Sequence, residues 1–168
     1  PNYAIAYNNL GNLLKELGEH QKAISSYEKA IQINPNYADA HYNLGVALQK
    51  LGQYQKAISS YEKAIQIQPN YAIAYNNLGN LLKELGEHQK AISSYEKAIT
   101  IQPNDAMAHY NLGNVLKELG QFQNAKNCFE KSMQIDPNDP DVNFNLGMLL
   151  LSMSDFKNGL IQYEWRKK

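Results

Sequence analysis

Residues 35–68 read PNYADAHYNLGVALQKLGQYQKAISSYEKAIQIQ, and this stretch contains the pattern that decides the fold. Close copies of it fill the rest of the 168-residue chain. Residues 1–31 are repeated letter for letter as residues 69–99. The copies begin at prolines spaced 34 residues apart, Pro1, Pro35, Pro69, Pro103 and Pro137. A fixed period of this size predicts a stacked-repeat architecture, in which each copy is one supersecondary unit.

Each copy contains two segments with helical periodicity. In residues 35–68, the first segment has His41, Leu44, Gly45, Leu48 and Leu51 at helical spacing, and the second has Tyr54, Ala57, Ile58, Tyr61, Ala64 and Ile65. The unit is therefore predicted to be a helix, a tight turn, a second helix and a short link. We expect Asn36 to cap the first helix, Gly52 to end it, and Pro69 to stop the second helix.

Gly45 is unusual because glycine inside a helix costs about 1 kcal/mol relative to alanine. It recurs at the same place in every copy, as Gly11, Gly79, Gly113 and Gly147. This recurrence predicts a close approach between two helices that leaves no room for a Cβ. We expect Ala57 to be the small residue facing Gly45, and Tyr61 to pack against the next unit.

The repeated positions resemble those of the tetratricopeptide repeat family. The family pattern of a large residue, Leu-Gly, a large residue, alanine, an aromatic residue, alanine and proline is matched by His41, Leu44-Gly45, Leu48, Ala57, Tyr61, Ala64 and Pro69. The resemblance covers the whole chain in five copies, residues 1–34, 35–68, 69–102, 103–136 and 137–168. It implies an all-α, right-handed superhelical solenoid of helix-turn-helix units, whose first helices line a concave groove. We expect a single array over residues 1–168, as a fragment of a longer protein.

The charge balance argues against nucleic acid as a partner. The chain has 16 Lys and Arg residues and 16 Asp and Glu residues, whereas binding to nucleic acid relies on basic side chains that neutralise phosphates. No apolar run approaches the ~20 residues that cross a membrane. Cys128 is the only cysteine, so no intrachain disulfide is possible, and we interpret it as an incidental thiol on an outer helix. We expect no membrane partner and a cytoplasmic location.

No residues form a recognisable catalytic or cofactor-binding pattern. The four histidines occupy repeat positions, with His20 equivalent to His88 and His41 equivalent to His109. Equivalent residues two units apart should lie roughly 20 Å from each other, because packed helices are ~10 Å apart. That separation is too large for a shared metal ion, whose ligands lie at about 2 Å. The sequence also lacks a phosphate-binding glycine motif. We therefore expect no enzymatic activity, no cofactor and no metal.

Asparagine precedes the Leu-Gly pair in all five units. These residues, here called the asparagine row, are Asn9, Asn43, Asn77, Asn111 and Asn145. Their position lies off the stripe that buries Leu44 and Leu48, and an amide offers both donors and an acceptor to a peptide backbone. A unit spacing of ~10 Å also matches about three residues of an extended chain. The row is therefore predicted to bind an extended peptide; in the alternative, these amides bond to neighbouring helices or to water.

Other positions on the same face extend the predicted peptide-binding site. They are the amides Asn12, Asn80 and Asn114 and the aromatic residues Tyr42, Tyr110 and Phe144. Asparagine rows at this position resemble those of O-linked N-acetylglucosamine transferases, where they contact substrate polypeptide. Residues 163–166 also resemble the last repeat of bacterial proteins with a glycosyltransferase domain. The sequence supports three hypotheses: a scaffold for an extended protein or peptide, a substrate-selecting module of a larger glycosyltransferase, and an array that associates end to end with itself.

Overall fold

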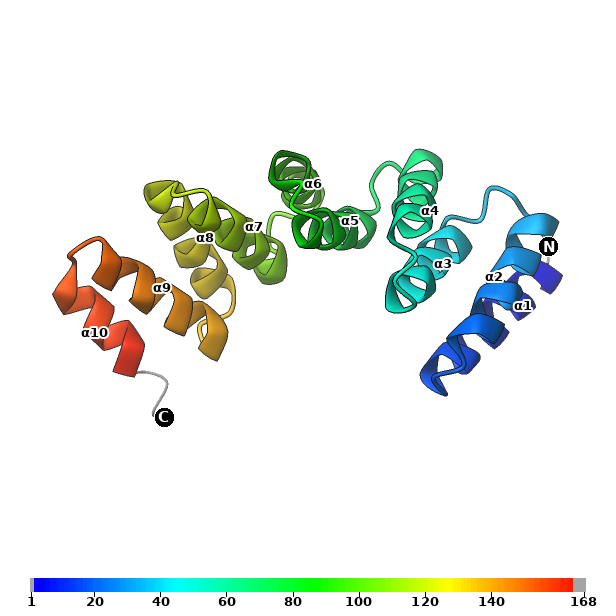
Figure 1. The fold of residues 1–168 in the computed structure, drawn as a ribbon, viewed down its shortest axis with the longest axis horizontal. Helices are drawn as coiled ribbons and strands as arrows, with labels where there is room; N and C mark the ends of the chain where they lie inside the picture. The colour runs from blue at the N-terminus through cyan, green and yellow to red at the C-terminus, as the bar shows by residue number, and fades with distance from the viewer. Residues whose placement is uncertain (1, 165–168) are drawn as a thin grey trace. The chain divides into compact units, whose positions relative to one another are not determined.

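The computed structural model describes residues 2–164, and these residues contain helices and no β-strand. Ten helices follow one another in this part of the chain (Figure 1): α1 (Asn2–Glu16), α2 (His20–Ile33), α3 (Ala38–Lys50), α4 (Tyr54–Ile67), α5 (Ala72–Glu84), α6 (His88–Ile101), α7 (Ala106–Glu118), α8 (Phe122–Ile135), α9 (Pro140–Ser152) and α10 (Phe156–Glu164). The prediction of an all-α chain built from five helix-turn-helix units is confirmed. Trp165 and Arg166, which belong to the segment that resembles bacterial glycosyltransferase proteins, lie outside the described residues.

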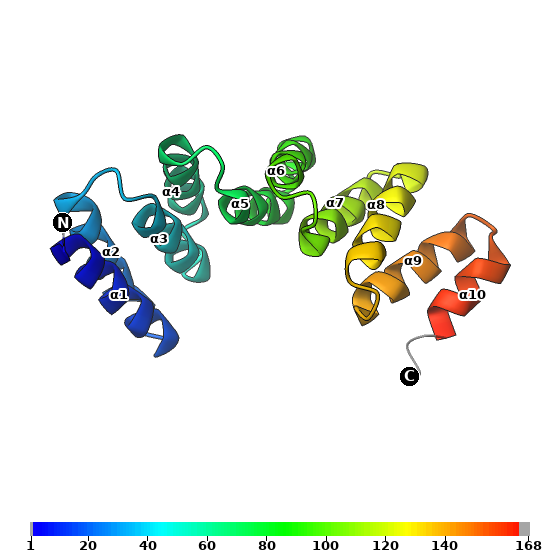
Figure 2. The ribbon, with the colours of Figure 1, turned by 180° about the vertical axis from the view of Figure 1, so that it is seen from behind.

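The helices group into two compact units, each of which is larger than a repeat. The first unit ends at Leu81 and the second begins at Leu82. In the first unit α1 packs against α2, α2 against α3, and α3 against α4, while α1 also touches α3. In the second unit the contacts run in the same way from α6 through α7, α8 and α9 to α10. Views from opposite sides show the helices of the pairs α1–α2, α3–α4 and α9–α10 side by side (Figures 1 and 2). The single array over residues 1–168 stays a prediction.

The predicted turn and helix stop are both present. Helix α3 ends at Lys50, and Gly52 in the following turn has a φ of 71°, the left-handed conformation that glycine adopts without a steric penalty. Helix α4 ends at Ile67, and Gln68 has φ −126° and ψ 88°, which lies outside the helical region that a following proline disfavours. Both helix ends therefore follow from the conformational preferences of single residues.

The predicted cap of α3 is wrong. The cap residue is Tyr37, and no side chain caps this helix. Asn36 lies in the turn before the helix, where its backbone N–H donates to the side chain of Asn34 at 3.2 Å. In the last repeat an aspartate occupies the Tyr37 position and does cap its helix, because Asp139 Oδ1 accepts from the backbone N–H of Asp141 at 2.8 Å. The capping position is thus one residue later in the repeat than the sequence interpretation placed it.

A buried aromatic ring explains the glycine inside each first helix. A Cβ on Gly45 would lie 2.8 Å from ring atoms of Tyr61 on α4, far closer than the ~3.5 Å at which carbon atoms pack. Gly113 meets the ring of Phe129 in the same way, at 2.7 Å. The predicted close approach is confirmed, but the residue that faces Gly45 is Tyr61 and not Ala57. Tyr61 therefore packs inside its own repeat, and its packing against the next repeat stays a prediction.

Helix α1 exposes apolar side chains that other first helices bury. Leu10 and Leu13 are 44% and 53% exposed, whereas Ala47 and Val115, at the Leu13 position of α3 and α7, are completely buried. Helices α3 and α7 each pack against the second helix of the preceding repeat, α2 and α6 respectively. End-to-end association would use this exposed face of α1, and it stays a prediction.

Candidate functional site

Side-chain hydrogen bonds from the asparagine row join the first helices of adjacent repeats. In the first unit, Asn43 Nδ2 on α3 donates to Asn8 Oδ1 on α1 at 3.0 Å. Asn77 Nδ2 on α5 donates to the hydroxyl oxygen of Tyr42 on α3 at 2.8 Å. Asn43 and Asn8 are both buried, and their hydrogen bond avoids the cost of burying either amide unpaired. For these residues the amides bond to neighbouring helices, which is the alternative that the sequence left open.

Asn145 has the same role in the second unit. Its Nδ2 donates to the Tyr110 hydroxyl at 3.0 Å and to the backbone carbonyl of Asp141 at 3.0 Å. Its Oδ1 accepts from Lys117 Nζ at 2.6 Å. Burial lowers the pKa of Lys117, whose Nζ also lies 5.9 Å from the centre of the Phe129 ring. Both polar atoms of the Asn145 side chain are therefore engaged within the protein.

The burial of the row differs from the sequence expectation. Asn43 and Asn111 are only 8% and 9% exposed, so they do not lie off the buried face, while Asn9 is exposed. Helix α3 contacts α1, α2 and α4, so its buried arc is wider than the single stripe that Leu44 and Leu48 define. Asn43, Asn77, Asn111 and Asn145 therefore lie at the border of the core, whereas Asn9 lies on the surface.

Asn43 and Asn77 nevertheless each have a side-chain oxygen that is available to accept a hydrogen bond. Within the described residues, their side-chain carbonyl oxygens accept no hydrogen bond. An amide carbonyl has two lone pairs, and the hydrogen bond from the Nδ2 atom fixes the direction in which they point. Two oriented acceptors on adjacent first helices are suited to the N–H groups of an extended chain.

The aromatic residues predicted for the site are half-buried and packed on other rings. Each lies tilted on the aromatic residue of its own second helix, with centroid distances of 6.0 Å for Tyr42–Tyr61, 5.9 Å for Tyr110–Phe129 and 5.9 Å for Phe144–Tyr163. Such pairs stabilise a fold by about 0.5–1.5 kcal/mol beyond the area they bury. These rings therefore stabilise each repeat, and contact with a peptide would be an additional role.

The outer amides of the predicted site lie on the same first helices. Asn12 Oδ1 on α1 accepts from the hydroxyl of Tyr27 on α2 at 2.9 Å, so this amide is tied to the second helix of its own repeat. Asn80 and Asn114 are half-buried. Their contact with a peptide stays a prediction.

The sequence interpretation missed the position one helical turn before the asparagine row. Its residues are Ile5, Asp39, Ile73, Met107 and Asp141. All five are exposed, and Ile73 and Met107 expose 49% and 53% of their surface. Their spacing of four residues from each asparagine was the available signal, because residues i and i+4 share a helix face. This position adds apolar and acidic side chains to the edge of the candidate site.

Two of the histidines hold the links between repeats. His41 Nε2 donates to the carbonyl oxygen of Pro35 at 2.9 Å, and His109 Nε2 donates to that of Pro103 at 3.0 Å. The described residues contain no group of three or more His, Cys, Asp or Glu side chains placed to hold a metal ion. Within the same residues, no helix has the length and apolar character of a membrane span.

Cys128 is expected to react slowly with thiol reagents. This free, half-buried cysteine lies on α8, and burial together with the charge of Glu96 raises its pKa from 9.0 to about 11. Near pH 8 its thiolate fraction is then roughly a hundredfold below that of an ordinary thiol. Labelling with dithionitrobenzoate, followed by absorbance, should be much slower for the folded chain than for the chain in urea. Equal labelling rates in the two states would contradict the effect of burial.

Family models match most of the chain. Models described as tetratricopeptide repeat match residues 36–104, 106–139 and 128–163, and one described as TPR repeat matches residues 11–52. Among curated protein sequences, none matches the chain significantly. These models test the repeat assignment and leave the resemblance to glycosyltransferases as a prediction.

Solved structures share the fold over almost the full chain. PilF of Pseudomonas aeruginosa is 28% identical, with a TM-score of 0.90 over 99% of this chain and 76% of that one. MamA of Desulfovibrio magneticus RS-1 is 23% identical, with a TM-score of 0.89 over 99% of this chain and 94% of that one. YrrB, described as a TPR protein with an unusual peptide-binding site, is 25% identical, with a TM-score of 0.80 over 97% of this chain and 84% of that one. With its repeats, its helix pairs and its matching family models in agreement, the chain belongs to the tetratricopeptide repeat family.

Proposed function

We propose that this chain is a protein-interaction scaffold that binds an extended polypeptide across its first helices. The observation that carries the proposal is the pair of carbonyl oxygens on Asn43 and Asn77, which accept no hydrogen bond within residues 2–164 and are each oriented by the hydrogen bond that their own Nδ2 donates. A peptide N–H that donates to such an acceptor forms a neutral hydrogen bond worth about 0.5–1.5 kcal/mol net. Recognition of this kind uses the backbone and so tolerates many side-chain sequences.

The chemistry of the surrounding face supports the same function. Exposed Ile5 and Ile73 offer apolar contacts, and exposed Asp39 lies at the equivalent position between them in the sequence of repeats. Positive and negative charges balance over the whole chain, so binding through the backbone should depend only weakly on salt. Membership of the tetratricopeptide repeat family and the peptide-binding site described for YrrB also support an interaction role.

A titration followed by nuclear magnetic resonance tests the proposal. The isotopically labelled chain is mixed with a synthetic pool of random peptides about nine residues long, enough to reach three members of the row. The side-chain amide signals of Asn43 and Asn77 should shift, while those of Asn36, in the turn before α3, serve as an internal control. The same pool with N-methylated backbones should bind more weakly. Shifts confined to second helices, or no shifts at all, would overturn the proposal.

A further inference from the structure

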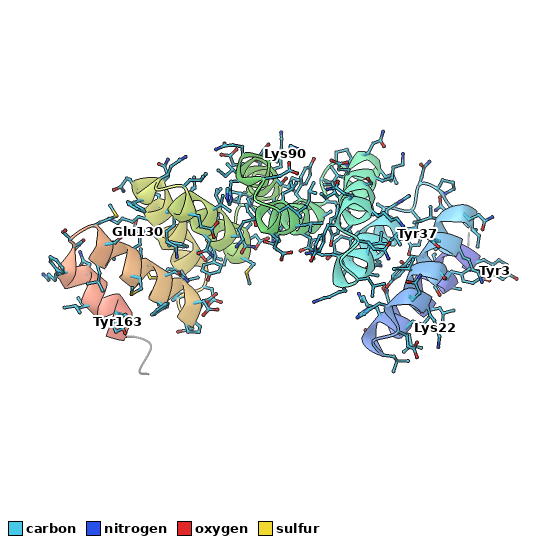
Figure 3. All side chains as sticks on the ribbon, in the orientation of Figure 1. Tyr3, Lys22, Tyr37, Lys90, Glu130 and Tyr163 are labelled. Carbon is cyan, nitrogen blue, oxygen red and sulfur yellow. The ribbon has the colours of Figure 1, made fainter. Side chains whose placement is uncertain are left out.

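Four side chains gather around the start of α3 and the link before α5, all within the first unit. They are Tyr37, Asp39, Tyr42 and Tyr71, here called the Asp39 cluster; Tyr37, at the start of α3, is labelled in Figure 3. The Tyr71 hydroxyl donates to Asp39 Oδ1 at 2.7 Å. The Tyr71 ring lies 5.3 Å from the Tyr42 ring and is tilted by 44°. Asp39 and Tyr42 are one helical turn apart on α3, so the carboxylate and the ring lie on one face.

The charge of Asp39 acts on two of the tyrosines. Burial, followed by the hydrogen bond and the charge of Asp39, raises the pKa of Tyr71, and burial with the charge of Asp39 raises the pKa of Tyr37. Asp39 itself is exposed, and no ion pair within the described residues includes it. A carboxylate has about four acceptor sites, of which the Tyr71 hydroxyl occupies one. The cluster therefore combines three tyrosine rings with a negative charge that lacks a cation within the described residues.

Packing and helix capping do not require a carboxylate at this position. The equivalent residues of the flanking repeats are Ile5 and Ile73, and the fourth repeat has Met107. Asp39 does not cap α3, because no side chain caps that helix. The helix dipole favours an acidic residue in the first turn, but this effect does not explain why the Tyr71 hydroxyl of the next repeat donates to it.

We propose that the Asp39 cluster is a subsite for a cationic side chain, arginine or lysine, of the polypeptide bound by the first helices; this inference rests on the proposed function. A cation at this place gains from the carboxylate charge and from the negative face of a tyrosine ring. Tyr42 connects the two sites, because its hydroxyl accepts from Asn77 while its ring packs on Tyr71. The asparagine row thus binds the backbone, and the cluster selects one side chain.

The test uses the whole 168-residue chain and four fluorescent peptides that differ at one central residue. The peptides are about nine residues long and alternate serine and alanine, with arginine, lysine, glutamine or glutamate at the centre. Fluorescence anisotropy should show about fivefold tighter binding of the arginine and lysine peptides than of the glutamine peptide, and the glutamate peptide should bind most weakly. High salt should reduce this preference because it screens exposed charges.

Two matched variants test whether Asp39 causes the preference for the arginine peptide. D39N keeps the shape of the side chain and removes its charge, so this variant should lose most of the preference for the arginine peptide over the glutamine peptide, and the tyrosine rings account for the remainder. D141N removes the same charge from the equivalent position of the last repeat, where no tyrosine hydroxyl of the described residues donates to the carboxylate. This second variant should keep the preference for arginine. Circular dichroism melts of both variants check that the fold is retained.

The outcomes distinguish the subsite from the scaffold function. If all four peptides bind the wild-type chain with equal affinity, the cluster is not a cation subsite, and the scaffold function remains. If D39N keeps the full wild-type preference for arginine, the subsite is also overturned. If no peptide binds, both the subsite and the proposed function are overturned.

Discussion

Replacing Gly45 with leucine is expected to lower the free energy of unfolding by about 3 kcal/mol or more. The new Cβ alone would lie 2.8 Å from the ring of Tyr61, and the leucine branch extends beyond it. The ring has little room to move, because Tyr61 is completely buried and its hydroxyl donates to Gln49 Oε1 at 2.9 Å. Urea unfolding followed by circular dichroism measures the loss.

A double-mutant cycle tests whether the loss comes from this contact. G45A crowds the ring and Y61L leaves a cavity, so in the double variant the new methyl group enters the vacated space. The double variant should therefore lose less than the sum of the single losses, by about 1 kcal/mol. G52A is the matched control, since a Cβ there meets nothing within 4 Å and only the φ of 71° is strained. Its effect should add to that of Y61L, and additive losses for G45A and Y61L would contradict the proposed contact.

Removing three members of the asparagine row is expected to destabilise the fold by about 3–4 kcal/mol. In N43A/N77A/N145A, the partner oxygens of Asn8, Tyr42 and Tyr110 each lose a donor. The loss of stability arises because a buried oxygen that loses its hydrogen-bond donor cannot bond to water instead. A row lying off the core would predict an intact fold, and the burial of Asn43 excludes that expectation. Guanidinium unfolding of the triple variant measures the loss.

Comparison of Y42F with N77A separates the structural role of the row from its role in binding. Both variants break the same hydrogen bond between Asn77 and Tyr42 and should lose similar stability. Only N77A also removes the carbonyl oxygen offered to a peptide. At a temperature where both variants are folded, the random peptide pool should therefore bind Y42F more tightly than N77A. Equal affinities would show that the Asn77 carbonyl does not contact peptide.

The ends of the helices were predictable from the sequence because they depend on single residues, whereas the cap of α3 was placed one residue too early. Gly52 and Pro69 determine helix ends through the conformations available to their own backbones. The residue facing Gly45 was not predictable in this way. A helical pattern shows which face of each helix is apolar, but it does not show which turn of one helix meets which turn of the other. Tyr61 and Ala57 are one turn apart on α4, and both fitted the pattern equally well.

The candidate site was predicted in position but not in its contacts. The recurrence of asparagine identified the face of the first helices, whereas the hydrogen bond from Asn43 joins residues that are 35 positions apart. Whether Asn43 faces solvent or a helix depends on how closely α1 approaches α3, which the sequence of one repeat does not contain. The Asp39 cluster was not predicted for the same reason, since Tyr71 belongs to the next repeat and is 32 positions from Asp39.

The hydrogen bonds between first helices have a consequence for how the array can change in length. In the three bonds described above, the donor is the side-chain amide of the asparagine row, and the acceptor is an amide oxygen at Asn8 or a hydroxyl oxygen at Tyr42 and Tyr110. Because both acceptor types accept from the same donor, a repeat with Asn or Tyr at this position can precede another repeat without a mismatched joint, whereas the last repeat has Phe144 there and offers no acceptor. Unequal recombination between near-identical copies can therefore insert or delete 34-residue blocks, and a new boundary that follows an Asn or Tyr acceptor keeps its hydrogen bond.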